Sequence, residues 1–169
     1  MAFQDRPGRQ IAGVHADAPA DNLFFTEYRC WMAGFKTRDA ACWDYAWDAL
    51  VRAVSKDFAK VLFSEFHLFA RTLRDEAKRD IAWRTDVCRC LCYDECLVLA
   101  LVSASQLHDQ PQEVTLASGL LGTDKVETFL EASRSLAEAM KNCQLLLEPA
   151  RKTVLGRLGL QMPETRVLH

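Results

Sequence analysis

The stretch CRCLCYDECLVLALVSASQL, residues 88–107, decides the fold that this sequence predicts. From residue 96 onward it is apolar on nearly every side of a helix, which is typical of a helix enclosed by other helices. Its uncharged run is too short to span a bilayer, which takes about 20 apolar residues. We therefore expect a buried central helix near residues 86–107, and no membrane-spanning segment.

The segments around this central helix repeat apolar residues at helical spacing. We expect helices after Asp21 or Asn22, after Asp39 as N-cap, and at about residues 56–78 after Ser55 as N-cap. Further helices are expected after Pro111 and Asp124. Strand alternation and Asn-Gly or Asp-Gly hairpin signals are absent from the sequence. The sequence thus predicts an all-α fold, an up-and-down bundle of five to six helices.

A length of 169 residues suits one domain, which we expect over residues 21–160. Residues 1–20 carry Pro7, Gly8, Gly13 and Pro19 without a periodic apolar pattern, and we expect a mobile N-terminal tail there. Residues 161–169 are expected to form a similar C-terminal tail.

The charge of the chain is close to balanced, with a net charge of −2 and basic residues scattered among acidic ones. A nucleic-acid or anionic-membrane partner would favour a concentrated basic face, so neither is expected. The first residues lack the apolar core of a secretory signal. We therefore expect a cytoplasmic protein, where thiols stay reduced, and the odd count of seven cysteines argues against a complete disulfide framework.

Four of the seven cysteines fall between residues 88 and 96. On a helix, with about 100° between successive residues, Cys88, Cys92 and Cys96 form one slowly drifting stripe. The spacing C-x-C-x-C-x3-C matches neither zinc-binding nor ferredoxin patterns. Buried cysteine commonly acts as a small apolar residue. We favour core packing, with a thiol switch or a metal site as alternatives.

Four carboxylates interrupt the predicted apolar surfaces: Glu65 and Glu76 on the third helix, and Asp94 and Glu95 on the central one. A buried carboxylate costs several kcal/mol unless it is paired. We expect an arginine–carboxylate fork, in which both carboxylate oxygens accept from one guanidinium. The candidate partners are Arg29, Arg71, Arg84 and Arg89.

A metal site in the bundle core is not favoured by the histidines. Di-metal helical bundles use Glu-x-x-His motifs, whereas this chain has Glu65-Phe66-His67, with His67 on the polar face of its helix. The third helix is expected to bury one apolar stripe made of Phe58, Val61, Leu62, Phe66, Phe69 and Leu73.

Large aromatic residues recur at helical spacing, which favours core anchors over a ligand pocket. This set comprises Trp31, Trp43, Trp47, Phe63, Phe66 and Phe69. Trp83 differs, because it lies in a polar connector beside arginines, and an exposed tryptophan there would suit a protein interface.

No catalytic motif is present: the sequence lacks a G-x-S-x-G elbow, a phosphate-binding P-loop and a dinucleotide fingerprint. We lean against an enzyme, and we predict no catalytic residue, cofactor or metal. The leading hypothesis is a small cytoplasmic helical protein that acts through protein–protein contact, as a homodimer. One alternative is a small-molecule pocket between the aromatic-rich helices. The other is a metal- or redox-responsive thiol or carboxylate site, with candidates Cys88, Cys92, Cys96, Asp94, Glu95, Glu65 and Glu76.

Overall fold

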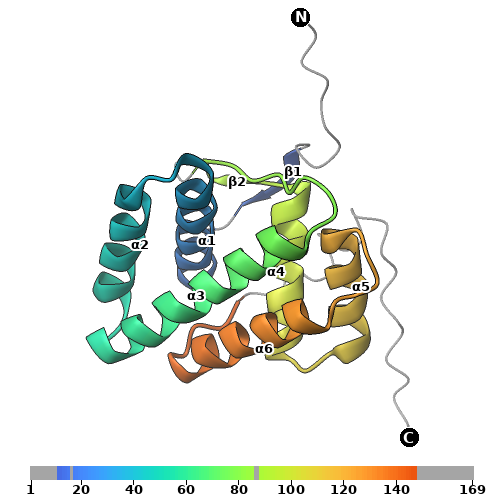
Figure 1. Cartoon of the computed structure of the whole chain (residues 1–169). Helices are drawn as coiled ribbons and strands as arrows, with labels where there is room; N and C mark the ends of the chain where they lie inside the picture. The colour runs from blue at the N-terminus through green and yellow to red at the C-terminus, as the bar shows by residue number, and fades with distance from the viewer. Residues whose placement is uncertain (1–10, 16, 86–87, 148–169) are drawn as a thin grey trace, which may run out of the picture.

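The computed structural model describes residues 11–15, 17–85 and 88–147 of the chain. It confirms the predicted all-α fold, because six helices pack as a bundle (Figure 1). The described part also contains one short pair of strands. In chain order the elements are β1 (Ile11–His15), α1 (Pro19–Thr37), α2 (Ala40–Ala53), α3 (Lys56–Glu76), β2 (Cys90–Cys92), α4 (Tyr93–Gln106), α5 (Gln110–Leu121) and α6 (Glu127–Asn142).

The helices are arranged in two directions. Figure 1 shows α3 and α6 slanting across the molecule, while α1, α2 and α4 stand upright. The main packed pairs are α1 with α2, α3 with α6, and α4 with both α5 and α6. Helix α4, whose run from Cys96 onward is uncharged, is therefore enclosed by its neighbours, as its sequence predicts.

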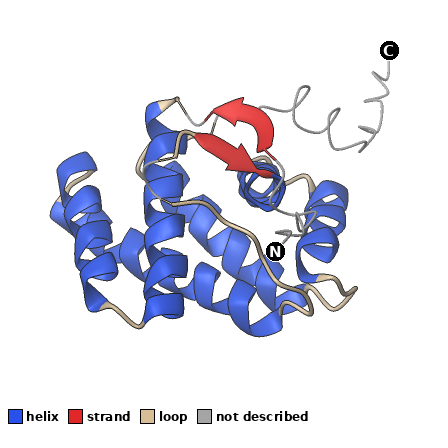
Figure 2. Ribbon diagram, turned by 90° about the horizontal axis from the view of Figure 1, so that it is seen from above, coloured by secondary structure: helices blue, strands red, loops and turns tan. Residues whose placement is uncertain are grey.

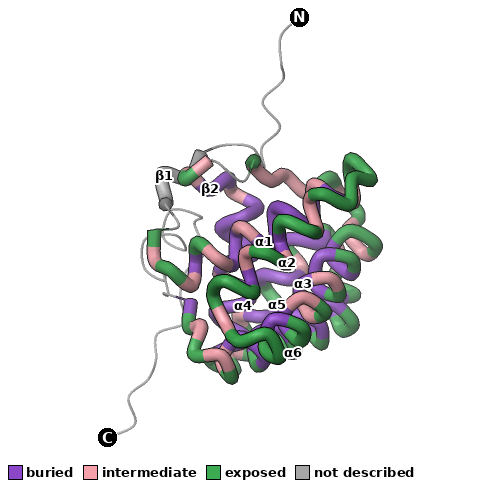
Figure 3. The backbone as a smooth tube through the Cα atoms, turned by 90° about the vertical axis from the view of Figure 1, so that its left-hand side faces the viewer, coloured by how far each residue is buried: buried purple, intermediate pink, exposed green. Residues whose placement is uncertain are grey.

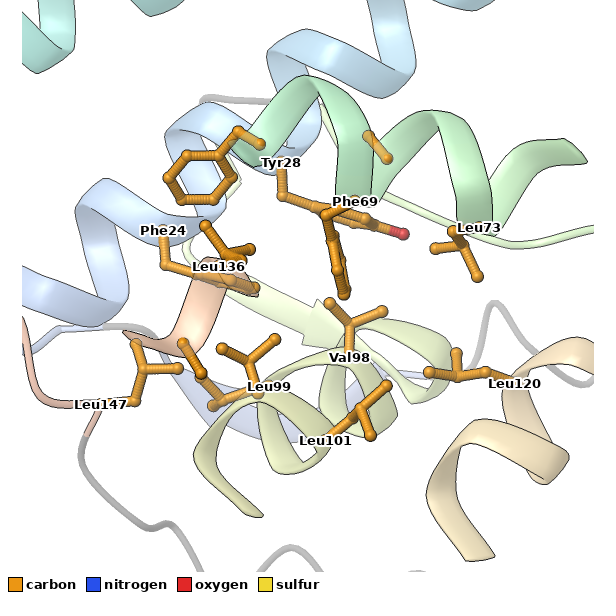
Figure 4. Packing of buried hydrophobic residues seen from close by; sticks show 14 of the residues in the cluster. Phe24, Tyr28, Phe69, Leu73, Val98, Leu99, Leu101, Leu120, Leu136 and Leu147 are labelled. Carbon is orange, nitrogen blue, oxygen red and sulfur yellow. The ribbon is translucent and has the colours of Figure 1, made fainter. Parts of the chain in front are cut away.

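One hydrophobic core joins all the helices. Figure 4 shows Phe24 and Tyr28 of α1, with Phe69 and Leu73 of α3, facing Val98 of α4. In Figure 3 the buried positions run along the inward sides of the helices. The residues that the core buries most completely are large aromatic and branched side chains, which supply most of the apolar area removed from water.

Two helix starts lie where the sequence placed them. Asp39 accepts a hydrogen bond from the amide of Ala41 at 2.9 Å, and Ser55 accepts one from the amide of Phe58 at 3.5 Å. Each side-chain oxygen satisfies an amide that has no partner inside its helix, which is why these residues begin helices.

The central helix is shorter than expected, because it begins at Tyr93 and not near residue 86. The preceding residues, Cys90–Cys92, form β2, which pairs antiparallel with β1 so that Ile11 lies opposite Cys92 and His15 opposite Cys90. Figure 2 shows this strand pair above the helices. A helix running through this segment would break the strand pair and move the acidic residues out of its first turn, where negative charge is favoured.

The ends of the chain are only partly described. Residues 11–15 belong to the segment expected as an N-terminal tail, yet they form β1, and α1 begins at Pro19. The expected C-terminal tail, residues 161–169, lies outside the described residues. Among the described residues, none of the helices is both long enough and apolar enough to cross a membrane.

Candidate functional site

The clearest concentration of buried charge lies at the start of α4. Glu95 is fully buried and forms a fork with Arg29 of α1: Nε donates to Oε1 at 2.7 Å and Nη2 to Oε2 at 3.0 Å. Glu95 also accepts from the amides of Arg84 at 3.0 Å and Cys92 at 2.9 Å. The predicted arginine–carboxylate fork is confirmed for Glu95, and its partner is Arg29.

Arg29 uses its remaining hydrogens on the backbone that leads into α4. Its Nη1 donates to the carbonyl oxygens of Thr85, at 3.1 Å, and Cys88, and its Nη2 donates to that of Cys90 at 3.2 Å. A guanidinium has five N–H donors, and all five are engaged here. Arg29 thus ties α1 both to α4 and to the connection that precedes α4. We call residues 77–85 of that connection the strap.

Asp94 forms a second clamp on the strap. It is buried, and it accepts from Arg79, Nη2 to Oδ1 at 2.7 Å and Nη1 to Oδ2 at 3.0 Å. Its Oδ2 also accepts from the amide of Ala82 at 2.7 Å. Arg79 reaches further, because its Nε donates to the carbonyl oxygen of Gly119 in α5 at 3.2 Å. The strap is therefore fastened to α4 and α5 as well as to α1.

These two carboxylates hold structure together and are poorly placed for chemistry. Every oxygen of Asp94 and Glu95 already accepts a hydrogen bond from an arginine. A general base needs an oxygen within reach of a substrate proton, which this arrangement does not offer. Removing one partner of a buried pair leaves an uncompensated charge, so a substitution in either clamp should destabilise the fold.

Tyr28 lies close to the same charges. Its hydroxyl is buried and has no hydrogen-bond partner in the described part of the chain. Burial, and secondly the negative charge of Glu95, raise the pKa of Tyr28 well above its ordinary value. The hydroxyl therefore stays protonated at all physiological pH values and offers no acid or base near neutrality.

The cysteines do not form the single helical stripe that the sequence suggested. Cys88 precedes β2, Cys92 ends it, and Cys96 lies in α4. The three residues therefore do not lie on one helix, and the helical spacing that would align them does not apply. None of the seven cysteines, every one inside the described residues, forms a disulfide. In those residues no three His, Cys, Asp or Glu side chains are grouped so as to hold a metal ion. The geometry thus lends a metal centre no support.

The two most buried thiols of the cluster are chemically quiet. Burial, with a smaller contribution from the charge of Glu95, raises the pKa of both Cys92 and Cys96 to about 12. Cys92 donates its thiol hydrogen to the carbonyl oxygen of Ala82 at 3.4 Å, which adds another contact to the strap. A thiol with such a high pKa is a poor nucleophile, because the thiolate is the reactive form.

The other two candidate carboxylates lie apart from this cluster. Glu65 and Glu76 are half-buried on α3, and within the described residues neither hydrogen bonds to an arginine of the two clamps. The Oε2 atom of Glu65 is buried without a partner. The structure thus brings together Asp94, Glu95 and the backbone of the cysteine segment, but not the α3 carboxylates.

Glu27 of α1 is a buried carboxyl group that the sequence analysis missed. Its side chain is fully buried, and neither oxygen has a hydrogen-bond partner in the described part of the chain. Burial raises the pKa of Glu27 from 4.5 to about 9, so it carries a proton at neutral pH. Its burial could have been predicted from its position four residues after Leu23 and four before Trp31, which places it on an apolar side of its helix.

The aromatic set divides into two groups. Phe66 and Phe69 belong to the main core, where the ring of Phe69 lies 5.2 Å from that of Phe129. The second group joins α1, α2 and α3 around Trp31, and its other members are Phe35, Trp43, Trp47, Phe63 and His67. His67 was expected on a polar face, but its ring stacks on Trp31 at 4.9 Å. Most of these rings pack against the core, as predicted.

Three apolar side chains on one side of α3 are open to solvent. Phe58, Val61 and Leu68 are 44%, 50% and 46% exposed, and their spacing of three and seven residues places them on one face. The sequence analysis put Phe58 and Val61 in the buried stripe, which is wrong, because the core is filled by Leu62, Phe66, Phe69 and Leu73 beside them. We call Phe58, Val61 and Leu68 the α3 stripe.

Comparison of the chain with protein-family models, with curated proteins and with solved structures finds no match.

Proposed function

We propose that this protein acts through protein–protein contact, as a homodimer, and that the α3 stripe lies at the interface. The supporting observation is the solvent exposure of Phe58, Val61 and Leu68, each near one half, along a single helix face. Exposed apolar side chains grouped on one helix face are typical of an interaction site, because their burial removes apolar area from water.

A second copy of this chain fits the stripe for a reason of symmetry. A two-fold interface uses the same patch on both subunits. If two α3 helices cross antiparallel with Val61 opposite Leu68 of the second copy, Asp57 approaches Arg71 of that copy. Both side chains are largely exposed, at 95% and 60%, so opposite charges would border the apolar contact. Such a rim favours one orientation of the two chains.

We also propose a reducing compartment, the cytoplasm, as the place where the protein works. The support comes from the sulfur chemistry: all seven cysteines lie in the described part of the chain, and none of them forms a disulfide there. Several of them, such as Cys42, Cys88 and Cys90, are partly exposed. Partly exposed thiols persist in compartments where thioredoxin and glutathione keep them reduced.

Light scattering coupled to size-exclusion chromatography tests the dimer. We expect the wild-type chain to be dimeric at high micromolar concentration, and Val61→Lys to be monomeric, because a buried ammonium at the interface loses its hydration. Val114→Lys on α5 is the matched control, since Val114 is 45% exposed and the substitution is the same. It should stay dimeric.

Two results would count against the proposal. A wild-type chain that is monomeric at high micromolar concentration would contradict the proposed homodimer. A dimer that survives Val61→Lys unchanged would place the interface on another surface.

A further inference from the structure

A cleft of about 290 Å³ opens between the C-terminal ends of α1 and α3 and the strap. Its apolar walls come from Met32 and Phe35 of α1 and from Ile81 and Trp83 of the strap. Lys36 and Arg74 are its basic side chains from the two helices. This size lies at the lower end of the range for small-molecule sites, which commonly combine apolar walls with a few charged groups.

Both helix cations lie over aromatic rings of the cleft. The ammonium of Lys36 is 5.7 Å from the centre of the Trp83 ring, and the guanidinium of Arg74 is 4.4 Å from that of Phe35. The negative face of an aromatic ring attracts a cation and holds it in place. Each positive charge therefore lies next to an aromatic ring. A ligand with both an anionic and an apolar group could contact the cation and the ring together.

Basic side chains outnumber acidic ones in the lining of the cleft, although the chain as a whole carries −2. Arg79 also lines the cleft, but its charge is matched by Asp94, and Arg74 shares its charge with Asp75 at 2.6 Å. Asp80 is the acidic residue of the lining. Lys36 forms no ion pair within the described residues, so it is the cation most available to an anion. An unpaired cation in a concave site attracts ligands that carry the opposite charge.

The strap wall is held in place before any ligand arrives. The amides of Ala82 and Arg84 donate to the carboxylates of α4, and the amide of Lys78 donates to the carbonyl oxygen of Leu121 at 2.7 Å. Ile81 and Trp83 of this wall both line the cleft. A wall that is already ordered costs a ligand little conformational entropy.

We propose that this cleft binds a small carboxylate that carries an aromatic or branched apolar group. The apolar group lies against Ile81, Trp83 and Met32, and the carboxylate lies between Lys36 and Arg74. The site is independent of the α3 stripe, and its occupation does not require a dimer.

Three probes that share one ring separate the contributions of charge and apolar contact. Indole-3-acetate carries a carboxylate, tryptamine an ammonium, and 3-methylindole no charge. Binding to the full chain is measured by isothermal titration calorimetry and by the NMR shift of the Trp83 Nε1–H signal. We expect indole-3-acetate to bind most tightly, 3-methylindole more weakly and tryptamine weakest. Inorganic phosphate should bind less well than indole-3-acetate, because it lacks the apolar group.

Two substitutions test where the ligand binds. Lys36→Gln should weaken indole-3-acetate binding about three- to fivefold, the usual effect of one exposed charge pair, and leave 3-methylindole unchanged. Lys60→Gln on α3 is the matched control and should change neither, because Lys60 lies outside the cleft lining. Far-UV circular dichroism checks that each variant is folded.

Several results would overturn this site. They are the absence of indole-3-acetate binding at millimolar concentration, equal binding of all three probes, phosphate binding as tight as that of indole-3-acetate, or equal effects of Lys36→Gln and Lys60→Gln.

Discussion

Replacing Glu27 with Gln tests whether one buried carboxylic acid makes the stability of this fold depend on pH. Glu27 is fully buried in α1, and neither of its oxygens has a partner in the described residues. Burial raises its pKa from 4.5 to about 9. Gln has nearly the same shape as Glu but does not ionise. The substitution therefore removes the titration of this side chain and leaves the packing almost intact.

The magnitude follows from the two pKa values. Below pH 4.5 the carboxyl is protonated in both the folded and the unfolded chain, and the fold keeps its full stability. Between pH 4.5 and about 9 only the unfolded chain ionises, so the free energy of unfolding falls as pH rises. The slope is about 1.4 kcal/mol per pH unit, which amounts to a loss of about 3 kcal/mol at pH 7. Glu27→Gln should therefore be the more stable protein at pH 7 by at most about 3 kcal/mol, since the buried amide also lacks partners.

The assay is urea unfolding followed by tryptophan fluorescence at several pH values between 5.5 and 8.5. The quantity of interest is the difference in the free energy of unfolding between variant and wild type, because other groups titrate equally in both. This difference should grow by about 1.4 kcal/mol for each pH unit. Glu131→Gln, at an exposed position of α6, is the control and should give a difference near zero at every pH.

A constant difference between Glu27→Gln and wild type across that range would refute the raised pKa of Glu27. A Glu27→Gln variant less stable at pH 8.5 than the wild type would refute it as well. Either result would mean that Glu27 has an ordinary pKa in the folded protein, as it would if it were paired or hydrated.

The remaining predictions concern the clamps, a close helix contact and the thiols. Glu95→Gln should lower the free energy of unfolding by about 3–5 kcal/mol in urea titrations, because it leaves a buried guanidinium uncompensated. Gly34→Ala should lower the melting temperature, since its methyl group would overlap a tryptophan of α2, at a cost of about 1–3 kcal/mol. Gly119→Ala, where no atom lies within 4 Å, should raise it. Cys92 and Cys96, whose pKa burial raises to about 12, should react with Ellman's reagent far more slowly in native than in unfolded protein, and equal rates would contradict their burial.

Features that depend on neighbouring residues were predictable from the sequence. The N-caps at Asp39 and Ser55 bond to amides two and three residues away, so the helix starts they mark require no knowledge of the fold. The apolar surface of α4 likewise indicates enclosure wherever its neighbours come from. The fork on Glu95 was also foreseen, since a carboxylate in a buried segment needs a cationic partner.

Features that depend on distant segments were not predictable in the same way. The fork joins Arg29 to Glu95 across 66 residues, and the sequence left four arginines as candidates. The exposure of Phe58 and Val61 depends on where α6 and α2 pack against α3. The burial of Glu27 depends on neighbours that its own helix does not supply.

The sequence alone determined that the chain is helical, where several helices begin, and which helix lies at the centre. These properties follow from backbone hydrogen bonds and side-chain periods within a few residues. Only the tertiary structure decided that α4 starts at Tyr93, because that start depends on a strand pair formed with residues 11–15 and on carboxylates bonded to the strap. Such contacts form when distant segments meet, and their energy is set by burial in the assembled core, which no local pattern encodes.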